Sequence, residues 1–341
     1  MIYPTMISIV IINYNGKEYL KDCLGSIAKS AYRDFEVILV DNNSKDGSVS
    51  FVEKYFPWVK IIKNKVNVGI AEGCNIGTKY SNGKYVVFFN TDVKVEHNWL
   101  EELVRTVESD PSVGACGCKV LRMDAKSIDC IGGFVCDTFG SGLYALGHLE
   151  EDRGQYDNVT ECFALAGMCM LVRRDVFEII GGFDSKFFLL VEDIDLCWRI
   201  RLAGYDIKVN PHAVVYHKSM ATLKKEKTKR DYIRFLVERN TLRMLIKNYS
   251  TKSLIRILPK YFAIILAESI FYIFITKIRW TISNMKAILW NIKNLRDSLA
   301  LHAYINATVR SVDDTDIQKK MLKNSLKINV FQRYLTSSKV I

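Results

Sequence analysis

The residues best placed to do chemistry are an amide and a carboxylate, Asn90 and Asp92, which follow directly on the valine- and aromatic-rich residues 85–89. Such a run, without polar alternation, is typical of a strand buried on both faces of a parallel sheet. Ligands bind at the carboxyl ends of such strands. An acid at this position meets a phosphate only through a metal ion, because two anions repel. The alternative is that residues 90–92 merely turn the chain and cap a helix from His97.

Three other apolar runs end in the same kind of residue. They cover residues 8–12, 35–40 and 59–62. Asn13 follows the first run, Asp41 the second, and Asn67 comes shortly after the third. Because the carboxyl ends of parallel strands lie along one edge of a sheet, we expect these side chains to converge with Asn90 and Asp92. One polar strand end is ordinary turn chemistry, but a succession of them favours a lined cleft.

Three carboxylates within four residues, Glu192, Asp193 and Asp195, follow the apolar residues 187–191 and open a predicted helix. Acids in a first helical turn are stabilised by the helix dipole, by about 0.3–1 kcal/mol each, so a well-capped helix is the alternative. A cap needs only one acid, however, and crowded like charges raise at least one pKa unless a cation is near. Such crowding is common at functional sites, and we favour a functional role.

His217 stands at the end of a further short apolar run, residues 213–216. A single histidine is usually structural. Its place at a strand end nevertheless leaves metal ligation open, because neutral imidazole is a common metal ligand.

Helical patterns separate the apolar runs of the first part of the chain, one of them over residues 70–81. Strand and helix alternate four times, which predicts an α/β fold with a doubly wound, mostly parallel sheet. Further on, residues 113–121 and 165–172 are predicted strands. The glycine-rich residues 131–147 indicate hairpins or a mobile loop.

The charge is distributed unevenly along the 341 residues, whose net charge is +11. Residues 1–217 hold 23 Lys and Arg against 29 Asp and Glu, whereas residues 218–341 hold 25 against 8. With 49% hydrophobic residues the chain can bury a core and is not disordered. The basic excess of the last third predicts a part that faces a polyanion or an anionic membrane.

The nine cysteines form no CxxC pair. They are predicted to be small core residues of a reduced, cytoplasmic protein rather than a disulfide or zinc framework. No signal peptide is expected, because the apolar residues 7–12 are too short for its hydrophobic region and lack a basic start.

The C-terminal third predicts helices at a membrane surface. Residues 222–248 are a basic helical stretch, and residues 261–275 are an apolar run shorter than the roughly 20 residues that a full span needs. From Ile278 to Ile292 apolar residues recur at helical spacing among lysines and tryptophans, as in an amphipathic helix at a membrane interface. The alternative is a helical subdomain packed on the first part or on a second subunit, which would allow a homodimer. The tryptophans, the few glycines and the apolar run disfavour a nucleic-acid-binding arm.

Together these residues resemble glycosyltransferase family 2, with its GT-A fold, and especially its rhamnosyltransferase-like branch in bacteria and archaea. The stretches that carry the resemblance are residues 10–15, 40–47, 67–75, 90–92, 182–184 and 192–199, with His217. The resemblance covers most of the first 220 residues. With the charge distribution and the helical pattern of the C-terminal third, it indicates three parts: a nucleotide-sugar-binding and catalytic GT-A domain (1–221), a basic, amphipathic helical region that associates with the membrane (222–310), and a polar tail (311–341).

The resemblance implies an inverting transfer of a sugar from a UDP-, dTDP- or GDP-sugar to an acceptor hydroxyl on a lipid-linked or polymeric glycan. Asp193 matches the family's catalytic base, with Glu192 beside it. Asp92 matches the aspartate that closes the DXD motif and coordinates Mg²⁺ or Mn²⁺, and His217 matches a position that completes the metal site in some members. Asp41 would bind the base or the ribose. The other positions implied to contact the nucleotide sugar are Tyr14, Asn15, Asn67, Gly69, Asn75, Asn90, Thr91 and Asp195.

One departure concerns the metal: Asn90 stands where the DXD motif usually has its first acid. An amide can hydrogen-bond a ribose or a bound water, but it contributes no charge to a cation site. The other residue types suit the chemistry by themselves. A carboxylate base activates a weakly acidic hydroxyl, typically by about 10²–10⁴-fold, and a divalent metal with oxygen ligands offsets the charge on a leaving phosphate.

We therefore expect a glycosyltransferase at the cytoplasmic face of the cell membrane, held there as a peripheral or monotopic protein. The alternative is a nucleotide-sugar-binding module that has lost catalysis; the intact pair Glu192 and Asp193 disfavours it, and Asn90 favours it weakly. Dehydrogenase and kinase functions are disfavoured, because no GxGxxG motif follows the first predicted strand and no glycine–lysine pair has a P-loop context.

Overall fold

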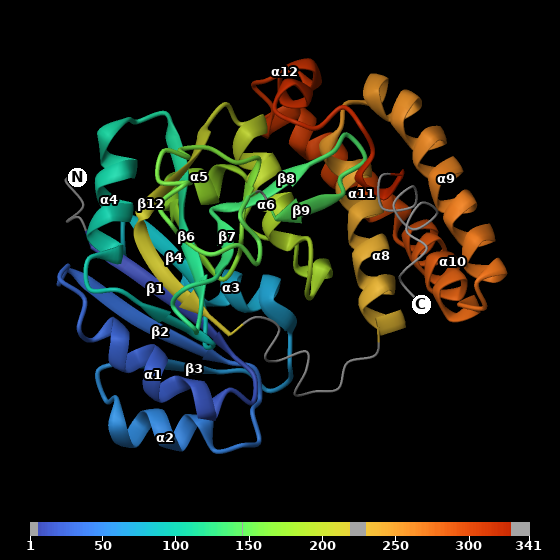
Figure 1. Cartoon of the computed structure of the whole chain (residues 1–341). Helices are drawn as coiled ribbons and strands as arrows, with labels where there is room; N and C mark the ends of the chain where they lie inside the picture. The colour runs from blue at the N-terminus through green and yellow to red at the C-terminus, as the bar shows by residue number, and fades with distance from the viewer. Residues whose placement is uncertain (1–5, 145, 219–229, 329–341) are drawn as a thin grey trace. The chain divides into compact units, whose positions relative to one another are not determined.

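The computed structural model describes residues 6–144, 146–218 and 230–328. The chain divides into two compact units, Met1–Phe134 with Tyr144–Lys227, and Val135–Leu143 with Thr228–Ile341. Strands and helices alternate in the first unit, and the second is mainly helical (Figure 1). The predicted boundary at residues 221 and 222 lies outside the described residues.

A nine-stranded sheet forms the framework of the first unit. Its order is β3-β2-β1-β4-β11-β6-β12-β5, with β7 paired to β6. The strands are β1 (Ile7–Asn13), β2 (Phe35–Asp41), β3 (Lys60–Lys63), β4 (Tyr85–Asn90), β5 (Val93–Val95), β6 (Val113–Arg122), β7 (Ile128–Ile131), β11 (Cys169–Arg173) and β12 (Asp206–His217). The predicted α/β class with a mostly parallel sheet is confirmed.

The polar strand ends lie along one edge of this sheet. Strands β1 to β4 are parallel, and β6 and β12 run the same way, because β11 lies antiparallel between β4 and β6. In register, Asn13 is opposite Asp41, and Ile12 is opposite Asn90. His217 ends β12 at the same edge, and β11 begins there. The predicted convergence of the strand ends is therefore a property of the topology.

The helices of the first unit are α1 (Lys17–Ile27), α2 (Ser48–Tyr55), α3 (Gly69–Lys79), α4 (Trp99–Ser109), α5 (Arg174–Ile179), the 3₁₀ turn η1 (Ser185–Phe187) and α6 (Glu192–Leu202). Trp99 of α4 is fully buried against Phe89 of β4, with ring centroids 5.6 Å apart. Such aromatic pairs contribute about 0.5–1.5 kcal/mol beyond their buried area. The contact fixes α4 on the strand that carries Asn90.

The predicted strand over residues 165–172 is split. β10 (Ala164–Leu165) joins β8 (Gly133–Cys136) and β9 (Gly142–Tyr144) in a small sheet, whereas β11 joins the main one. The break falls before Met168, whose carbonyl oxygen accepts a hydrogen bond from the Asn90 N–H (3.1 Å). The strands β8 and β9 confirm the hairpins predicted in residues 131–147. All nine cysteines are buried and free, as predicted for core residues.

The second unit contains α8 (Arg230–Asn248), α9 (Thr251–Phe274), α10 (Ile278–Lys293), α11 (Leu295–Tyr304), the π-helical turn η2 (Ile305–Val309) and α12 (Asp314–Lys319). Among the described residues, α9 is the one helix long and apolar enough to cross a membrane by length and composition, which is a weak indication. The described part of the predicted polar tail is packed: Ile317 and Leu326 are buried, and the Leu326 N–H donates to Asp137 Oδ2 (2.7 Å).

Candidate active site

Asp41, at the end of β2, is held as a hydrogen-bond acceptor. Its Oδ1 accepts from Asn13 Nδ2 (2.7 Å) and its Oδ2 from the Ser44 N–H (3.0 Å). Asn13 Nδ2 also donates to the Ser44 hydroxyl (3.0 Å). Asp41 is only 3% exposed, yet each carboxylate oxygen keeps a lone pair for one more donor. The arrangement therefore orients Asp41 without using its full capacity to accept.

The loop after β1, which contains Tyr14 and Asn15, is tied to its neighbours. The Asn15 N–H donates to Ser44 Oγ (2.9 Å), and Asn15 Oδ1 accepts from the Lys45 N–H (2.8 Å), both in the loop after β2. A Cβ on Gly16 would lie 2.9 Å from Oγ1 of Thr91, so this loop also packs on the turn after β4. The structure thus brings Asn15 and Thr91 to the strand edge that carries Asp41.

Three predicted residues lie in α3 or just before it. Asn67 Oδ1 accepts from the Gly69 N–H (2.9 Å). Gly69 has a φ of +83°, and a Cβ there would lie 2.3 Å from the Phe188 carbonyl oxygen, so glycine is required. Asn75 exchanges two hydrogen bonds with the backbone of Phe183 (2.9 Å each). Gly69 and Asn75 therefore support the segment that leads into α6.

Asp92 and His217 face one another across paired strands. Val93 of β5 is opposite His217 of β12, and His217 Nε2 lies 3.6 Å from Asp92 Oδ2. Both residues are buried, each 7% exposed. The turn that carries Asp92 leads into β5 and not into the helix that the capping alternative required. The predicted pair of metal ligands is thus brought together.

The second ring nitrogen of His217 is held by Asp129 of β7, with Nδ1 2.8 Å from Oδ2. A carboxylate on one imidazole nitrogen fixes the ring and directs the other nitrogen, as in many metal sites. Burial disfavours the cationic ring, but hydrogen bonds with Asp129 and Asp92 outweigh it and raise the pKa of His217 to about 9. The imidazole therefore holds a proton that a metal at Nε2 would displace.

The donor set suits a hard divalent ion. Asp92 offers oxygen and His217 offers nitrogen, and Mg²⁺ or Mn²⁺ commonly takes few protein ligands and completes its shell with phosphate and water. Within the part of the chain that the structure describes, no group of three or more His, Cys, Asp and Glu is arranged to hold an ion. Asp92 and His217 therefore fit an ion only if it takes its remaining ligands from outside this pair.

Replacing Asp129 with asparagine is expected to lower Mn²⁺ affinity about 10–100-fold, because the charge that orients His217 is lost. Titration with Mn²⁺, followed by the electron paramagnetic resonance spectrum of the free ion, measures this affinity, and circular dichroism checks the fold. Asp124→Asn, an exposed acid in the turn before β7, is the control. Equal affinity in both variants would contradict a positioning role for Asp129.

Asp193, the second residue of α6, is joined to the end of β4 through one short loop. Its Oδ2 accepts from the Gly167 N–H (3.0 Å) and its Oδ1 from the Ile194 N–H (2.8 Å). Gly167 precedes Met168, which binds Asn90. Burial raises the pKa of Asp193, and the two N–H groups oppose that rise. Such a partly buried carboxylate can accept a proton from a hydroxyl.

Glu192 is a buried acid with a free oxygen. It is 7% exposed, and among the described residues its Oε2 has no hydrogen-bond partner. Burial, and then the charge of Asp193, raise the pKa of Glu192 well above its usual range. The preceding Phe188, Leu190 and Val191 all have positive φ, which typically costs about 1–3 kcal/mol per residue and is least tolerated by β-branched valine. Unpaired acids and strained backbone cluster at functional sites.

Replacing Glu192 with glutamine is expected to raise the melting temperature more at pH 9 than at pH 5.5. Burial favours the neutral acid, so the wild-type chain loses stability as the pH rises through the raised pKa of Glu192, and glutamine carries no charge to lose. Each 1 kcal/mol shifts the melting temperature by about 2–4 °C in a domain of about 150–250 residues, the size range of the first unit. A difference in melting temperature between variant and wild type that is the same at both pH values would contradict the raised pKa of Glu192.

Asp195 has a structural place. It is fully buried and pairs with Arg199, whose Nη2 and Nε lie 2.8 and 3.1 Å from Oδ2. Arg199 Nη1 also donates to the carbonyl oxygens of Ile180 and Gly182 (2.7 and 2.5 Å). The ion pair holds α6 to the loop after α5. The contact of Asp195 with the nucleotide sugar, which the resemblance implies, stays a prediction.

Sequence patterns did not predict Asp129 or Gly167. The only local signal for Asp129 is a single acid inside the apolar run of residues 128–131. Gly167 contributes only its backbone N–H, which every residue except proline has, so its residue type does not indicate this role.

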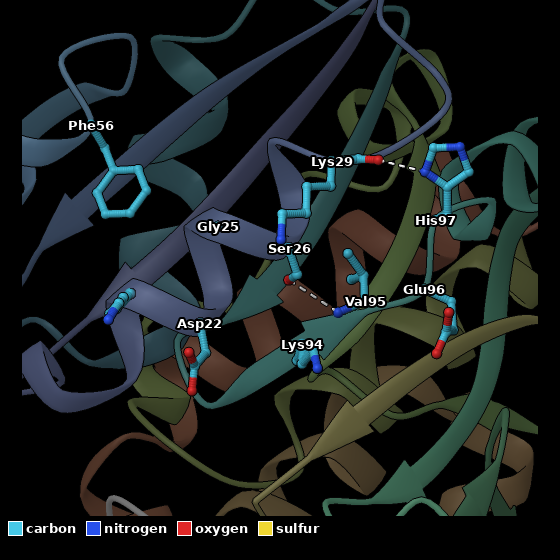
Figure 2. Close-up of a pocket in the computed structure, with 10 residues that line it drawn as sticks. Asp22, Gly25, Ser26, Lys29, Phe56, Lys94, Val95, Glu96 and His97 are labelled. Carbon is cyan, nitrogen blue, oxygen red and sulfur yellow. Dashed lines mark hydrogen bonds between the residues drawn. The ribbon is translucent and has the colours of Figure 1, made fainter.

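A pocket of about 610 Å³ opens elsewhere on the first unit (Figure 2). Its lining residues are Lys21, Asp22, Gly25, Ser26, Lys29, Phe56, Lys94, Val95, Glu96 and His97. Ser26 Oγ accepts from the Val95 N–H (3.1 Å), which ties α1 to β5 in its wall. None of the predicted site residues lines this pocket.

The family model described as Glycosyl transferase family 2 matches residues 8–180. The chain belongs to glycosyl transferase family 2. This glycosyltransferase is 24% identical to N-acetylglucosaminyl-diphospho-decaprenol L-rhamnosyltransferase of Mycobacterium tuberculosis, over 64% of this chain and 78% of that protein. It is 27% identical to rhamnosyltransferase WbbL of Escherichia coli K12, over 62% and 83%. The family and the rhamnosyltransferase-like branch are therefore as predicted.

The fold of the glycosyltransferase is similar to that of mannosyltransferase PcManGT from Pyrobaculum calidifontis, solved in complex with GDP-Man and Mn²⁺. The TM-score is 0.52 at 17% identity, over 98% of this chain and 88% of that one. The predicted GT-A fold is confirmed. Two longer curated relatives are matched over only 26% and 17% of their own length, and one solved structure over 48%.

Proposed function

We propose that this glycosyltransferase moves a sugar, with inversion, from a nucleoside diphosphate to a hydroxyl of a lipid-linked or polymeric glycan. The observation that supports this most is the meeting of two kinds of group at one sheet edge. Asp92 and His217 form a pair of metal ligands, and Asp193 is a carboxylate base. Asn90 connects the metal-ligand pair with the base. It precedes Asp92 by two residues, and its N–H donates a hydrogen bond to the loop that holds Asp193.

In the proposed reaction Asp193 takes the proton of the acceptor hydroxyl while the hydroxyl oxygen attacks the sugar. Attack from the face opposite the leaving diphosphate inverts the configuration, and no enzyme nucleophile is needed. Asp41, fixed by Asn13, accepts hydrogen bonds from the nucleoside. A divalent ion held by Asp92 and His217 would offset the charge on the departing diphosphate when bound.

The acceptor class rests on similarity and on charge. The mycobacterial relative is named for transfer of rhamnose to a lipid diphosphate, which supports rhamnose as the sugar and a lipid-linked acceptor here. The 25 basic against 8 acidic residues of the last third support a location at the cytoplasmic face of the membrane, peripheral or monotopic.

A thermal-shift panel of UDP-, GDP- and dTDP-sugars, each with and without Mn²⁺, tests the proposal. A donor at about 100 times its Kd stabilises the fold by about 2.7 kcal/mol, and Mn²⁺ should increase the shift. Release of the nucleoside diphosphate on adding an acceptor would then show transfer. Stabilisation by donors without any release, across many acceptors, would instead favour a non-catalytic nucleotide-sugar-binding module, which Asn90 in place of an acid makes the second candidate.

A further inference from the structure

The helix α10 buries uncharged polar residues and exposes most of its large aliphatic ones. Its buried positions are Ser283, Asn284, Ala287 and Asn291. Five of its large apolar side chains are 43–62% exposed: Ile278, Ile282, Met285, Leu289 and Ile292. A surface helix of a water-soluble protein has the opposite arrangement. The outer face of α10 therefore matches an apolar environment better than water.

The second half of α9 also has an apolar outer face. Its exposed large side chains are Phe262, Leu266, Ile270, Ile273 and Phe274, which are 40–79% exposed. Glu268 is the one acidic or basic residue in this half. It turns inward, where its Oε2 lies 2.8 Å from Arg234 and 3.4 Å from Lys327. No charge is thus left on the outer face of this half of α9.

The two helices form one hairpin within the helical unit, and Figure 1 draws them side by side. Thr281 Oγ1 donates to the Ser269 carbonyl oxygen (2.9 Å), and Asn284 Nδ2 donates to Ser269 Oγ (3.0 Å). The rings of Tyr272 and Trp280 meet edge to face at 5.1 Å. Polar contacts therefore join the helices on the inside, and the apolar side chains remain outside.

Every exposed charge on this hairpin is positive. Residues 251–294 contain seven basic residues, all exposed: Lys252, Arg256, Lys260, Lys277, Arg279, Lys286 and Lys293. Their single acid is the inward Glu268. An anionic bilayer attracts such a surface by about 1 kcal/mol for each basic residue near it. A second copy of the chain would bring like charges together, which disfavours self-association through this face.

We propose that the α9–α10 hairpin docks on an anionic phospholipid bilayer, with its apolar side chains in the interfacial layer and its basic residues among the headgroups. Although α9 as a whole is long and apolar enough to span, its run between Lys260 and Lys277 is shorter than the roughly 20 residues of a full span and contains Glu268, so we place the hairpin in the surface layer. The inference deepens the proposed function, and rests on it only in assigning to the hairpin the task of holding the enzyme near a lipid-linked acceptor.

Flotation of the full chain with phosphatidylcholine vesicles, with and without phosphatidylglycerol, tests this. The wild-type chain should float with the anionic vesicles, and salt should weaken the binding. Ile270→Glu and Leu289→Glu should each lower the bound fraction about tenfold or more, because each places a charge on the inserted face. Lys286→Glu should weaken binding to anionic vesicles only.

Val66→Glu is the control, at an apolar residue of the first unit that is 61% exposed, against 46% for Ile270 and 57% for Leu289, and it should float as the wild type does. Equal flotation of the hairpin variants and the control would overturn the proposal, as would a dimer that Ile270→Glu dissociates. Transfer to a water-soluble acceptor separates the two hypotheses. Loss of flotation with intact transfer identifies the docking surface, whereas intact flotation without transfer contradicts only the proposed reaction.

Discussion

Asp193→Asn is expected to lower the rate of sugar transfer by about 10²–10⁴-fold while donor binding stays within a few-fold. The amide keeps the size of the side chain and one acceptor oxygen, but it cannot take a proton from a hydroxyl at neutral pH. Gly167 and Ile194 hold the carboxylate in place in the absence of substrate. The loss should therefore appear in the transfer step and not in the affinity for the donor.

Asp175→Asn is the matched control for this experiment. Asp175 also lies in the first turn of a helix and accepts a hydrogen bond from the next N–H (2.9 Å), but its side chain is 65% exposed. Nucleotide release during turnover and donor affinity by calorimetry are the two readouts. Normal turnover by the Asp193 variant would remove the general base from the proposed mechanism, whatever the control shows.

Asp92→Asn is expected to lower Mn²⁺ affinity by about 100-fold or more in the presence of a nucleoside diphosphate. A metal ligand contributes more than a residue that only orients one, for which losses of about 10–100-fold are typical. The charge of Asp92 matters especially here, because Asn90 supplies none. Transfer by the variant should approach that of the wild-type enzyme treated with a chelator.

Glu101→Gln, on the exposed side of α4, removes the same charge away from the pair of Asp92 and His217 and should leave Mn²⁺ binding unchanged. Calorimetric titration of Mn²⁺ with and without the nucleoside diphosphate separates the ion's affinity from that of the nucleotide. If the Asp92 variant and the control bound Mn²⁺ equally, the assignment of Asp92 as a metal ligand would be wrong.

Local patterns predicted the strands of the first unit well because burial on both faces of a sheet requires continuous apolar runs. The predicted bounds of β1, β2 and β4 differ from the observed bounds by no more than one residue at either end. The prediction of one strand over residues 165–172 was wrong for the same reason. Both halves of this range are buried, so their apolar character is continuous although they belong to different sheets. Periodicity carries no information about which sheet a buried strand joins.

The sequence by itself determined the class of the fold, the family, and the edge where Asn13, Asp41, Asn90 and Asp92 meet, because parallel strands place their carboxyl ends together. Tertiary structure alone decided which acids form the candidate site and which are used in packing. Asp129 and His217 are 88 residues apart and meet only through the pairing of β7 and β12 with β6. Asp195 and Asp193 are two positions apart on one helix, and packing buries the first against Arg199 while Gly167 holds the second.

The same division applies to the helical unit. The spacing of apolar residues in α10 predicted an amphipathic helix, but spacing cannot say which face is packed inward. Contacts with the neighbouring helices decided that, by turning Asn284 and Asn291 inward and leaving Ile282 and Leu289 outside. The physical reason is general: local sequence sets the periodicity of an element, and only long-range contacts choose the face that is removed from solvent.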